Sequence, residues 1–166
     1  MRDDPLRENA EKKAFRLLTL RAHSEKELAA KLDERGFSED VVAGVLEKCR
    51  ELGYLNDEKF ARQRARELAV NRLLGDRRIV LDLREKGIPE ALSRQAIEEV
   101  RAEIGEEKAI EAILRRRGRA KATDAMDEKE KARLMRSLLG KGFPTGLVYR
   151  KLKTAKEEEV HDDDGE

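Results

Sequence analysis

Apolar residues recur along the chain in a pattern tied to three glycine-centred segments. These are Arg35-Gly36-Phe37-Ser38, Lys86-Gly87-Ile88-Pro89 and Lys141-Gly142-Phe143-Pro144. In each, a base precedes the glycine, an apolar residue follows it, and Ser or Pro comes next. Glycine readily takes the left-handed conformation that ends a helix, and Ser or Pro suits the start of the next helix. Each segment is therefore predicted to be a tight turn between two helices.

Apolar positions keep the same distance from all three glycines. Four residues before them lie Leu32, Leu83 and Leu138, and eight before lie Leu28, Ile79 and Leu134. Five residues after them lie Val41, Leu92 and Leu147, and ten after lie Leu46, Ile97 and Leu152. Positions separated by four or five residues share one face of a helix. A period of 51 and then 55 residues between the glycines predicts stacked helical repeats.

Each repeat is predicted to contain three helices, and no stretch alternates with the period of two that is typical of strands. The expected helices span 9–22, 24–35, 38–52, 56–72, 77–86, 90–104, 106–117, 128–141 and 145–158, with a longer link at 118–126. Ser24 with Glu27, and Asp127 with Glu130, are expected capping boxes. The predicted fold is an elongated all-α array of three tandem three-helix repeats with no sheet. Its expected divisions are a polar arm at 1–9, repeats at 10–55, 56–104 and 105–158, and an acidic tail at 159–166.

The composition favours a thin, elongated array rather than a protein with one rounded core. Hydrophobic residues make up 39% of the 166 residues and charged residues 44%, with 4% aromatic and no Trp. The chain is thus less apolar and more charged than an average globular domain, and an elongated repeat protein tolerates more surface per residue. The polar start does not resemble a signal peptide, and no apolar run approaches the ~20 residues that span a membrane. We therefore expect a cytoplasmic protein that does not contact membranes.

Candidate catalytic residues are scarce. Cys49 falls near the apolar face of its helix, and neither His23 nor His161 belongs to a recognisable constellation. No phosphate-binding glycine loop or metal-ligand cluster is present in the sequence. The distinctive segment at 53–61, GYLNDEKFA, has a structural interpretation, because Asn56 suits a helix N-cap and Asp57 complements the helix dipole. We therefore expect neither an enzyme nor a cofactor.

Charge is distributed unevenly. The last ten residues contain seven acids and no Lys or Arg, and removing those seven charges from the net charge of +1 leaves +8. Arginine pairs well with phosphates and carboxylates, so two basic clusters are the candidate binding sites. The first comprises Arg62, Arg64, Arg66, Arg72, Arg77, Arg78, Arg84 and Lys86, all but Arg64 being candidate contacts, and the second Arg115, Arg116, Arg117, Arg119 and Lys121. An ion-paired, solvated surface is the competing interpretation, and the clusters alone do not distinguish nucleic acid from an acidic protein.

Several local motifs, in this order, resemble the RecX family. They are Ala14-Phe15-Arg16-Leu17-Leu18 with Arg21, His23, Ser24, Glu27 and Leu28, then GYLNDEKFA, then 72–79 (RLLGDRRI) and 83–88 (LREKGI). The likeness covers roughly residues 10–155 and is strongest from 14 to 100. The third repeat matches mainly through Leu138 and the segment 141–143.

The resemblance to the RecX family implies a bacterial cytoplasmic regulator of the RecA recombinase. Such a protein lies in the helical groove of the RecA–DNA filament and restrains ATPase, strand exchange and recombination. The resemblance also implies direct binding of single- or double-stranded DNA by some members, and supplies no catalytic residue. Two alternatives stay open: an autonomous DNA-binding helical protein, and a structural adaptor for an acidic protein. A monomer is expected.

Overall fold

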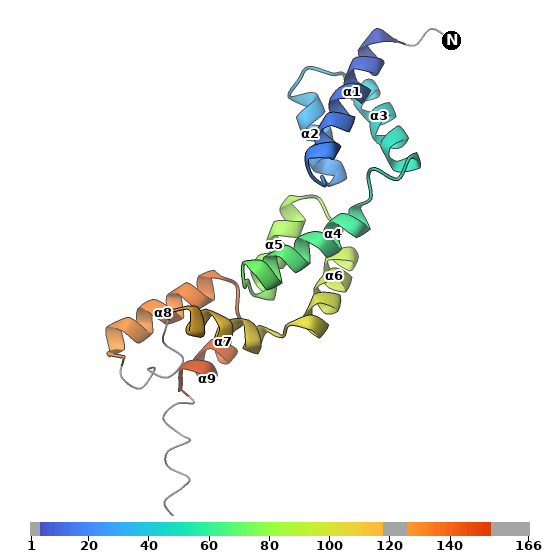
Figure 1. Cartoon of the computed structure of the whole chain (residues 1–166). Helices are drawn as coiled ribbons and strands as arrows, with labels where there is room; N and C mark the ends of the chain where they lie inside the picture. The colour runs from blue at the N-terminus through green and yellow to red at the C-terminus, as the bar shows by residue number, and fades with distance from the viewer. Residues whose placement is uncertain (1–3, 118–125, 154–166) are drawn as a thin grey trace, which may run out of the picture.

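The computed structural model describes residues 4–117 and 126–153. Within these residues it contains nine α-helices and one π-helical turn, and no strand (Figure 1). The elements are α1 (Pro5–Leu20), α2 (Glu25–Asp33), α3 (Glu39–Glu51), α4 (Asp57–Arg66), the π-helical turn Glu67–Asn71, α5 (Asp76–Glu85), α6 (Glu90–Glu103), α7 (Glu106–Arg116), α8 (Glu128–Gly140) and α9 (Thr145–Lys153). The prediction of an all-α array of three three-helix repeats is confirmed.

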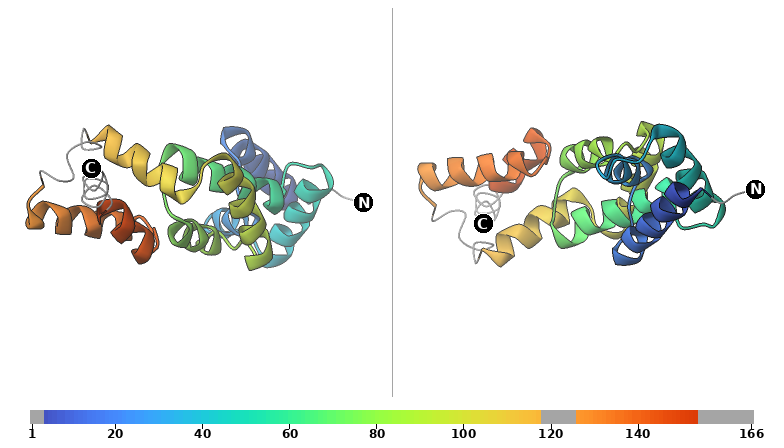
Figure 2. Two further views of the ribbon diagram at one scale, coloured as in Figure 1. Left: turned by 90° about the horizontal axis from the view of Figure 1, so that it is seen from below. Right: turned by 90° about the horizontal axis from the view of Figure 1, so that it is seen from above.

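The three bundles follow one another in an elongated arc (Figures 1 and 2). Helices α1–α3 form the first, α4–α6 the second and α7–α9 the third. The second helix of each bundle, α2, α5 or α8, lies on one side of the arc, and α3 and α6 lie on the other (Figure 1). Each bundle buries its own apolar cluster, so the array has three small cores joined in series.

The three glycine turns have the predicted geometry. Gly36, Gly87 and Gly142 have φ angles of +83°, +78° and +90°. In each turn the N–H of the following apolar residue donates to the carbonyl of the leucine five residues earlier, as Ile88 does to Leu83 at 3.0 Å. This is the Schellman motif, in which a left-handed residue lets the last helical carbonyls find donors. The base-glycine-apolar pattern is therefore a helix-ending signal.

The two predicted core columns before each glycine and the predicted N-caps are also confirmed, whereas Val41 and Leu92 of a later column are only half-buried. Leu28, Leu32, Ile79, Leu83, Leu134 and Leu138, on α2, α5 and α8, are at most 1% exposed. Ser24 accepts the N–H of Glu27 while Glu27 accepts the N–H of Ser24, which completes a capping box. Asn56 and Asp127 cap α4 and α8 through their side-chain oxygens. Cys49 is fully buried in the first core, and burial raises the pKa of its thiol.

Two helix boundaries within the described residues differ from prediction by more than two residues. Helix α1 begins at Pro5 and not at 9, because Asp4 accepts the N–H of Leu6 at 3.1 Å and Pro5 needs no partner for a first-turn N–H. Part of the expected polar arm at 1–9 is therefore helical. The expected helix 56–72 ends as an α-helix at Arg66 and continues as the π-helical turn. The end of the expected helix 145–158 lies outside the described residues.

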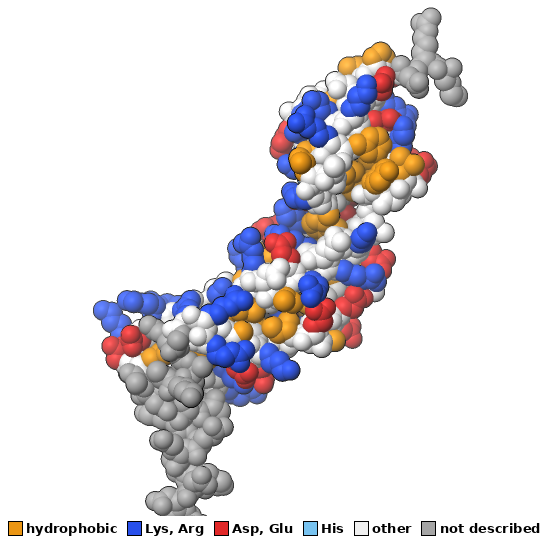
Figure 3. All heavy atoms as spheres, viewed as in Figure 1, with side chains coloured by type: hydrophobic (Ala, Val, Ile, Leu, Met, Phe, Trp, Pro, Cys, Tyr) orange, Lys and Arg blue, Asp and Glu red, His pale blue; other side chains and the backbone are white. Residues whose placement is uncertain are grey.

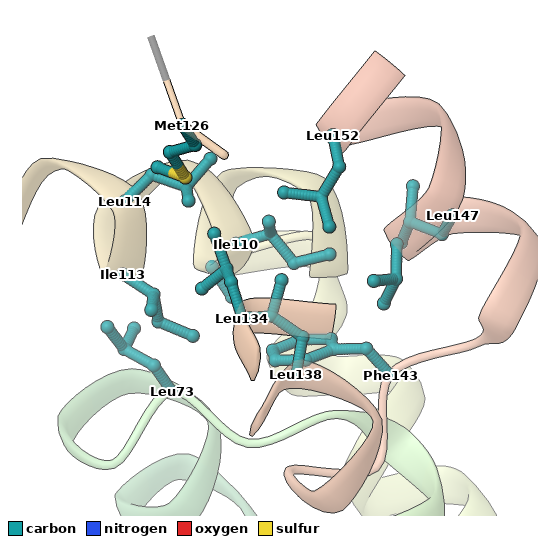
Figure 4. Close-up of a cluster of buried hydrophobic side chains, with 12 residues drawn as sticks. Leu73, Ile110, Ile113, Leu114, Met126, Leu134, Leu138, Phe143, Leu147 and Leu152 are labelled. Carbon is teal, nitrogen blue, oxygen red and sulfur yellow. The ribbon is translucent and has the colours of Figure 1, made fainter. Parts of the chain in front are cut away.

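The π-helical turn redirects the chain so that one leucine reaches the next repeat. Leu73 follows the turn with a left-handed φ of +52° and is only 3% exposed. Figure 4 shows Leu73 beside Ile113, within the core of the third repeat. The left-handed conformation costs a non-glycine residue about 1–2 kcal/mol, and burying a leucine side chain contributes about 1.5–3 kcal/mol. Leu73 thus links the second and third cores at little net cost.

A carboxylate joint is repeated at both boundaries between repeats. The Asp57 carboxylate accepts the N–H of Glu25, the first residue of α2, at 2.8 Å. The Glu106 carboxylate accepts the N–H of Asp76, the first residue of α5, at the same distance. In both cases the first residue of a repeat's first helix caps the second helix of the preceding repeat. Burial, opposed by these hydrogen bonds, raises the pKa of both Asp57 and Glu106.

An arginine and a glycine turn complete each joint. Arg50 contacts Glu25 at 2.9 Å and Arg101 contacts Asp76 at 2.6 Å. In both repeats, therefore, an arginine of the third helix pairs with the acid that begins the second helix. The glycine turn of the later repeat packs on the start of the earlier second helix. A Cβ on Gly87 would lie 2.8 Å from Lys26 Cβ, and a Cβ on Gly142 would lie 2.4 Å from the Arg78 nitrogen. Equivalent contacts thus set the angle between neighbouring repeats.

Glu27 gives the first joint a pH dependence. Burial opposes its ionisation, but hydrogen bonds from Arg21, Lys86 and the Ser24 backbone outweigh burial and lower the pKa of Glu27 from 4.5 to about 2. An acid with a lowered folded-state pKa stabilises the fold above its unfolded pKa, and this contribution disappears as the pH falls towards 2. We expect the Glu27 contribution to the free energy of unfolding, on the order of 2 kcal/mol, to be lost over this range.

Urea unfolding from pH 2.5 to 7 checks this expectation in wild type and in Glu27→Gln. The glutamine keeps the shape of Glu27 but has no proton to bind, so the two stability profiles should converge at low pH. Parallel profiles would show that Glu27 ionisation does not stabilise the joint.

Candidate interaction surface on the second helices

The first predicted basic cluster is divided by ion pairing. On α4, Arg62 contacts Glu58 at 2.7 Å and Glu99 at 3.0 Å, and Arg66 contacts Glu103 at 3.1 Å. The pairs with Glu99 and Glu103 join α4 to α6. Such arginines are already neutralised by the protein's own carboxylates and are less available to an anionic partner.

The remaining paired bases of this cluster also serve the fold. Arg72 lies 3.7 Å from Glu67, and Lys86 lies 2.6 Å from Glu27 in the first joint. Arg64, which belongs to the same basic stretch, donates two hydrogen bonds of 2.7 and 2.8 Å to the Asp82 carboxylate. The hydrogen bond to Asp82 raises the pKa of Arg64, which keeps the guanidinium charged. This part of the cluster fits the solvated, ion-paired interpretation.

Helix α5 retains the unpaired bases. Arg77, Arg78 and Arg84 are exposed, and within the described residues none of them forms an ion pair or a side-chain hydrogen bond. Arg78 and Arg84 have no carboxylate partner among the described residues, whereas the charge of Arg77 acts on Glu106 without an ion pair and opposes the rise in the pKa of that acid. The structure therefore narrows the first candidate site to this helix.

The second predicted cluster is partly described. Arg115, Arg116 and Arg117 are exposed at the C-terminal end of α7, where positive charge complements the helix dipole. Arg117 donates to the Ser137 hydroxyl at 3.0 Å, whereas Arg115 and Arg116 have no such partner among the described residues. Arg119 and Lys121 lie outside the described residues.

Unpaired bases recur on the second helix of every repeat. Across the described chain, the bases of α2, α5 and α8 without an ion pair or a side-chain hydrogen bond are Lys26, Lys31, Arg77, Arg78, Arg84, Lys129, Arg133 and Arg136. We call this set the second-helix row. Two unpaired acids, Asp33 and Glu85, occur on these helices, each in the last turn. Figure 3 shows Lys and Arg side chains in a line along the upper edge of α8.

The opposite side of the array carries the reverse charge. All four bases of α3 and α6 form ion pairs, namely Lys48, Arg50, Arg94 and Arg101. The acids of these helices that lack a partner in the described part of the chain are Glu39, Asp40, Glu47, Glu51 and Glu98. The free charge is thus positive on the second helices and negative on α3 and α6, whereas α9, the third helix of the third repeat, contains bases and no acid. An anionic partner would be attracted to one side of the array.

Sequence reasoning missed the members of the row on α2 and α8. Lys26, Lys31 and Lys129 have acids nearby in the sequence, and Arg133 and Arg136 are separated by apolar residues, so no continuous basic run marks these five bases. The repeat register was the available signal, since α2, α5 and α8 each precede a glycine turn. Ion pairing decides which bases are free, and that depends on side chains that are distant in the sequence.

Other chemistry is sparse in the described residues. They contain no group of three or more His, Cys, Asp or Glu side chains arranged to hold a metal ion. His23 is buried beside the Arg21 carbonyl at 2.9 Å, and burial lowers the pKa of its imidazole. No helix in the described ranges has the length and apolar character needed to cross a bilayer.

These features define an all-α tandem-repeat protein with segregated surface charge. Family models described as the first, second and third three-helix domains of RecX match residues 10–49, 56–97 and 105–152. The regulatory protein RecX of Syntrophotalea carbinolica is 32% identical over 87% of this chain and 94% of its own length. The corresponding protein of Mycolicibacterium smegmatis is 33% identical over 86% of this chain and 77% of its own. The chain belongs to the RecX family.

Solved structures agree with this assignment. A crystal structure of a regulatory protein RecX superposes with a TM-score of 0.67 at 26% identity, covering 90% of this chain and 72% of that one. The crystal structure of RecX from Lactobacillus salivarius gives a TM-score of 0.68 at 21% identity, over 90% of this chain and 96% of the other. The second likeness supports the fold.

Proposed function

We propose that this protein is a non-enzymatic regulator that binds the RecA–DNA filament in its groove and restrains ATPase and strand exchange. In this proposal it acts in the cytoplasm as a monomer and needs no cofactor. The observation that carries the proposal is the second-helix row, in which every repeat presents unpaired bases on the same side of the array. Membership of the RecX family supports RecA as the partner in this proposal.

The repeated surface suits a repeated partner. A filament presents the same acidic and phosphate groups at regular intervals, and an array with fixed joints can contact several of them at once. Each contact raises the effective concentration of the next, so weak contacts combine into tight binding. Such bridging changes filament activity only if it fits one filament conformation better than another.

ATPase and strand exchange by RecA on single-stranded DNA test the proposal. The protein is titrated at low ratios to RecA, and we expect inhibition below one copy per protomer because one copy spans more than one protomer. Tight binding to bare DNA without any effect on RecA would favour an autonomous DNA-binding protein. If the protein neither inhibits RecA nor binds bare DNA, the result would favour a structural adaptor for another acidic protein.

The acidic tail is expected to weaken binding. Residues 157–166 carry seven acids, and a tethered acidic segment competes with an external anion for a basic surface. Deleting 157–166 should strengthen filament or DNA binding by roughly threefold or more at low salt, and the gain should shrink as salt screens the charges. Affinity is measured by fluorescence anisotropy. The length-matched variant replaces all seven acids of the tail with Asn or Gln. Unchanged affinity for both variants would exclude this competition.

A further inference from the structure

Helix α5 combines its free charge with an exposed apolar stripe. Val80 and Leu81 are 41% and 42% exposed, whereas Ile79 and Leu83 on the same helix are fully buried. Arg77 and Arg84 lie one turn to either side of the exposed pair. Spacings of three, four and seven residues place these four side chains on one face of a helix. We call Arg77, Val80, Leu81 and Arg84 the α5 stripe.

A groove continues the stripe towards α6. It has a volume of about 640 Å³, and its lining includes Val80, Arg84, Ile88, Ser93 and Ile97. Ile88 and Ile97 are 5% and 8% exposed, so the floor of the groove is apolar and belongs to the core of the second repeat.

The other charged side chains along this groove are neutralised within the protein. Asp76 contacts Arg101 at 2.6 Å, and Glu90 contacts Arg94 at 2.7 Å. Arg84 is therefore the lining residue whose charge has no partner in the described chain. The groove thus offers an apolar floor and one free positive charge at its edge.

This combination fits a protein partner better than bare nucleic acid. Surfaces that bind single strands place aromatic rings under the bases, and phosphate contacts need only charge and hydrogen-bond donors. Val80 and Leu81 provide neither. Apolar residues beside arginine are instead typical of the energetically dominant centre of a protein–protein interface.

We propose that the α5 stripe and its groove dock an acidic amphipathic segment of a protein partner, which under the proposed function is the RecA protomer. An apolar side chain of that segment packs on Val80 and Leu81 and enters the groove. Carboxylates on either side of it pair with Arg77 and Arg84, whose positions are about 10 Å apart along the helix axis. The proposal rests on the proposed function for the identity of the partner, and on the stripe for its chemistry.

The double variant Val80→Ser with Leu81→Ser separates protein from nucleic-acid contact. We expect its Kd for a RecA filament on single-stranded DNA to rise about 10-fold or more, because the apolar centre of the contact is lost. Its Kd for the same DNA without RecA should stay within about twofold, because phosphate contacts are electrostatic. Leu20→Ser on α1 is the matched control, since Leu20 is 75% exposed and far from the groove in sequence. It should change neither value.

Two outcomes of this comparison would overturn the proposal. An unchanged Kd for the filament would mean that the stripe is not part of the contact. An equal loss on bare DNA would mean that α5 binds nucleic acid.

A peptide titration tests the stripe without the filament. NMR spectra of the Val80 and Leu81 methyl groups are followed as a synthetic peptide, Glu-Glu-Leu-Leu-Glu-Glu, is added, with hexaglutamate as the control. We expect saturable shifts that are larger for the leucine-containing peptide. Equal shifts for both peptides, or none at millimolar concentration, would overturn the proposed chemistry even if the filament binds. If the leucine-containing peptide shifts the methyl signals but the protein does not bind the filament, the proposed function is refuted. The proposed chemistry of the α5 stripe would then still hold.

Discussion

Alanine at Gly142 is expected to loosen the third repeat from the second and to lower the free energy of unfolding by roughly 2–5 kcal/mol. Two effects add. A left-handed alanine costs about 1–2 kcal/mol, and the new Cβ would lie 2.4 Å from the Arg78 nitrogen and 2.6 Å from its Cβ. Because part of this contact is with backbone, the two repeats must move apart to admit the methyl group. Such overpacking typically costs about 1–3 kcal/mol.

Gly36→Ala is the matched control for this prediction. Gly36 occupies the same place in the first turn with a φ of +83°, and nothing lies within 4 Å of a Cβ built on it. Gly36→Ala should therefore lower the free energy of unfolding only by the cost of a left-handed alanine, about 1–2 kcal/mol. Urea unfolding followed by circular dichroism measures both variants. Equal losses would show that the Gly142 contact does not hold the two repeats together.

Reversing Arg77, Arg78 and Arg84 to Glu is expected to weaken filament binding by roughly 100-fold or more and to abolish inhibition of RecA. Breaking one charged contact at an interface typically costs about 2–5 kcal/mol, and the variant replaces three attractions with repulsions. The arginines are exposed and make no ion pair in the described chain, so helicity should be retained.

The control reverses three arginines that are already paired. Arg62, Arg66 and Arg94 form ion pairs with the protein's own acids, and their reversal changes the net charge equally. We expect less than about a tenfold loss of binding, with a small loss of stability because exposed ion pairs contribute about 0–1 kcal/mol each. Similar losses for the two triple variants would mean that binding follows net charge. Retained inhibition in the α5 variant would exclude that helix as the contact surface.

The internal structure of each repeat could be predicted from the sequence. The helix-ending turns, the N-caps and the buried columns depend on residues within about ten positions of each other, such as Gly87 with Leu83 and Ile79. Local backbone chemistry and helical periodicity decide them. This also explains why the segment GYLNDEKFA was correctly interpreted as a corner capped by Asn56.

The joints between repeats were not predicted, because each depends on pairs far apart in the sequence. Asp57 was expected only to complement its own helix, yet it caps α2 across a separation of 32 residues. One signal was present: Arg50 follows Glu25, and Arg101 follows Asp76, by 25 residues in both cases. Arginine and acid at equal spacing in two repeats indicate an equivalent contact, but only once the repeat boundaries are known.

The candidate site was only partly predictable for a related reason. Arg62 and Arg77 look alike in the sequence, since both lie in an arginine-rich stretch. The structure separates them, because Glu99 of α6 forms an ion pair with Arg62, whereas Arg77 acts on Glu106 without forming an ion pair in the described chain. A basic run therefore predicts where positive side chains gather, and the packing of neighbouring helices determines which of them remain available.

Amide hydrogen exchange of this protein, measured with and without a RecA filament on single-stranded DNA, tests most directly whether the second-helix row binds the filament. We expect slower exchange on α2, α5 and α8 when the filament is present, with exchange on α3 and α6 unchanged. Protection on α3 and α6, or no protection on any repeat, would contradict the claim that the second-helix row is the surface that binds the filament.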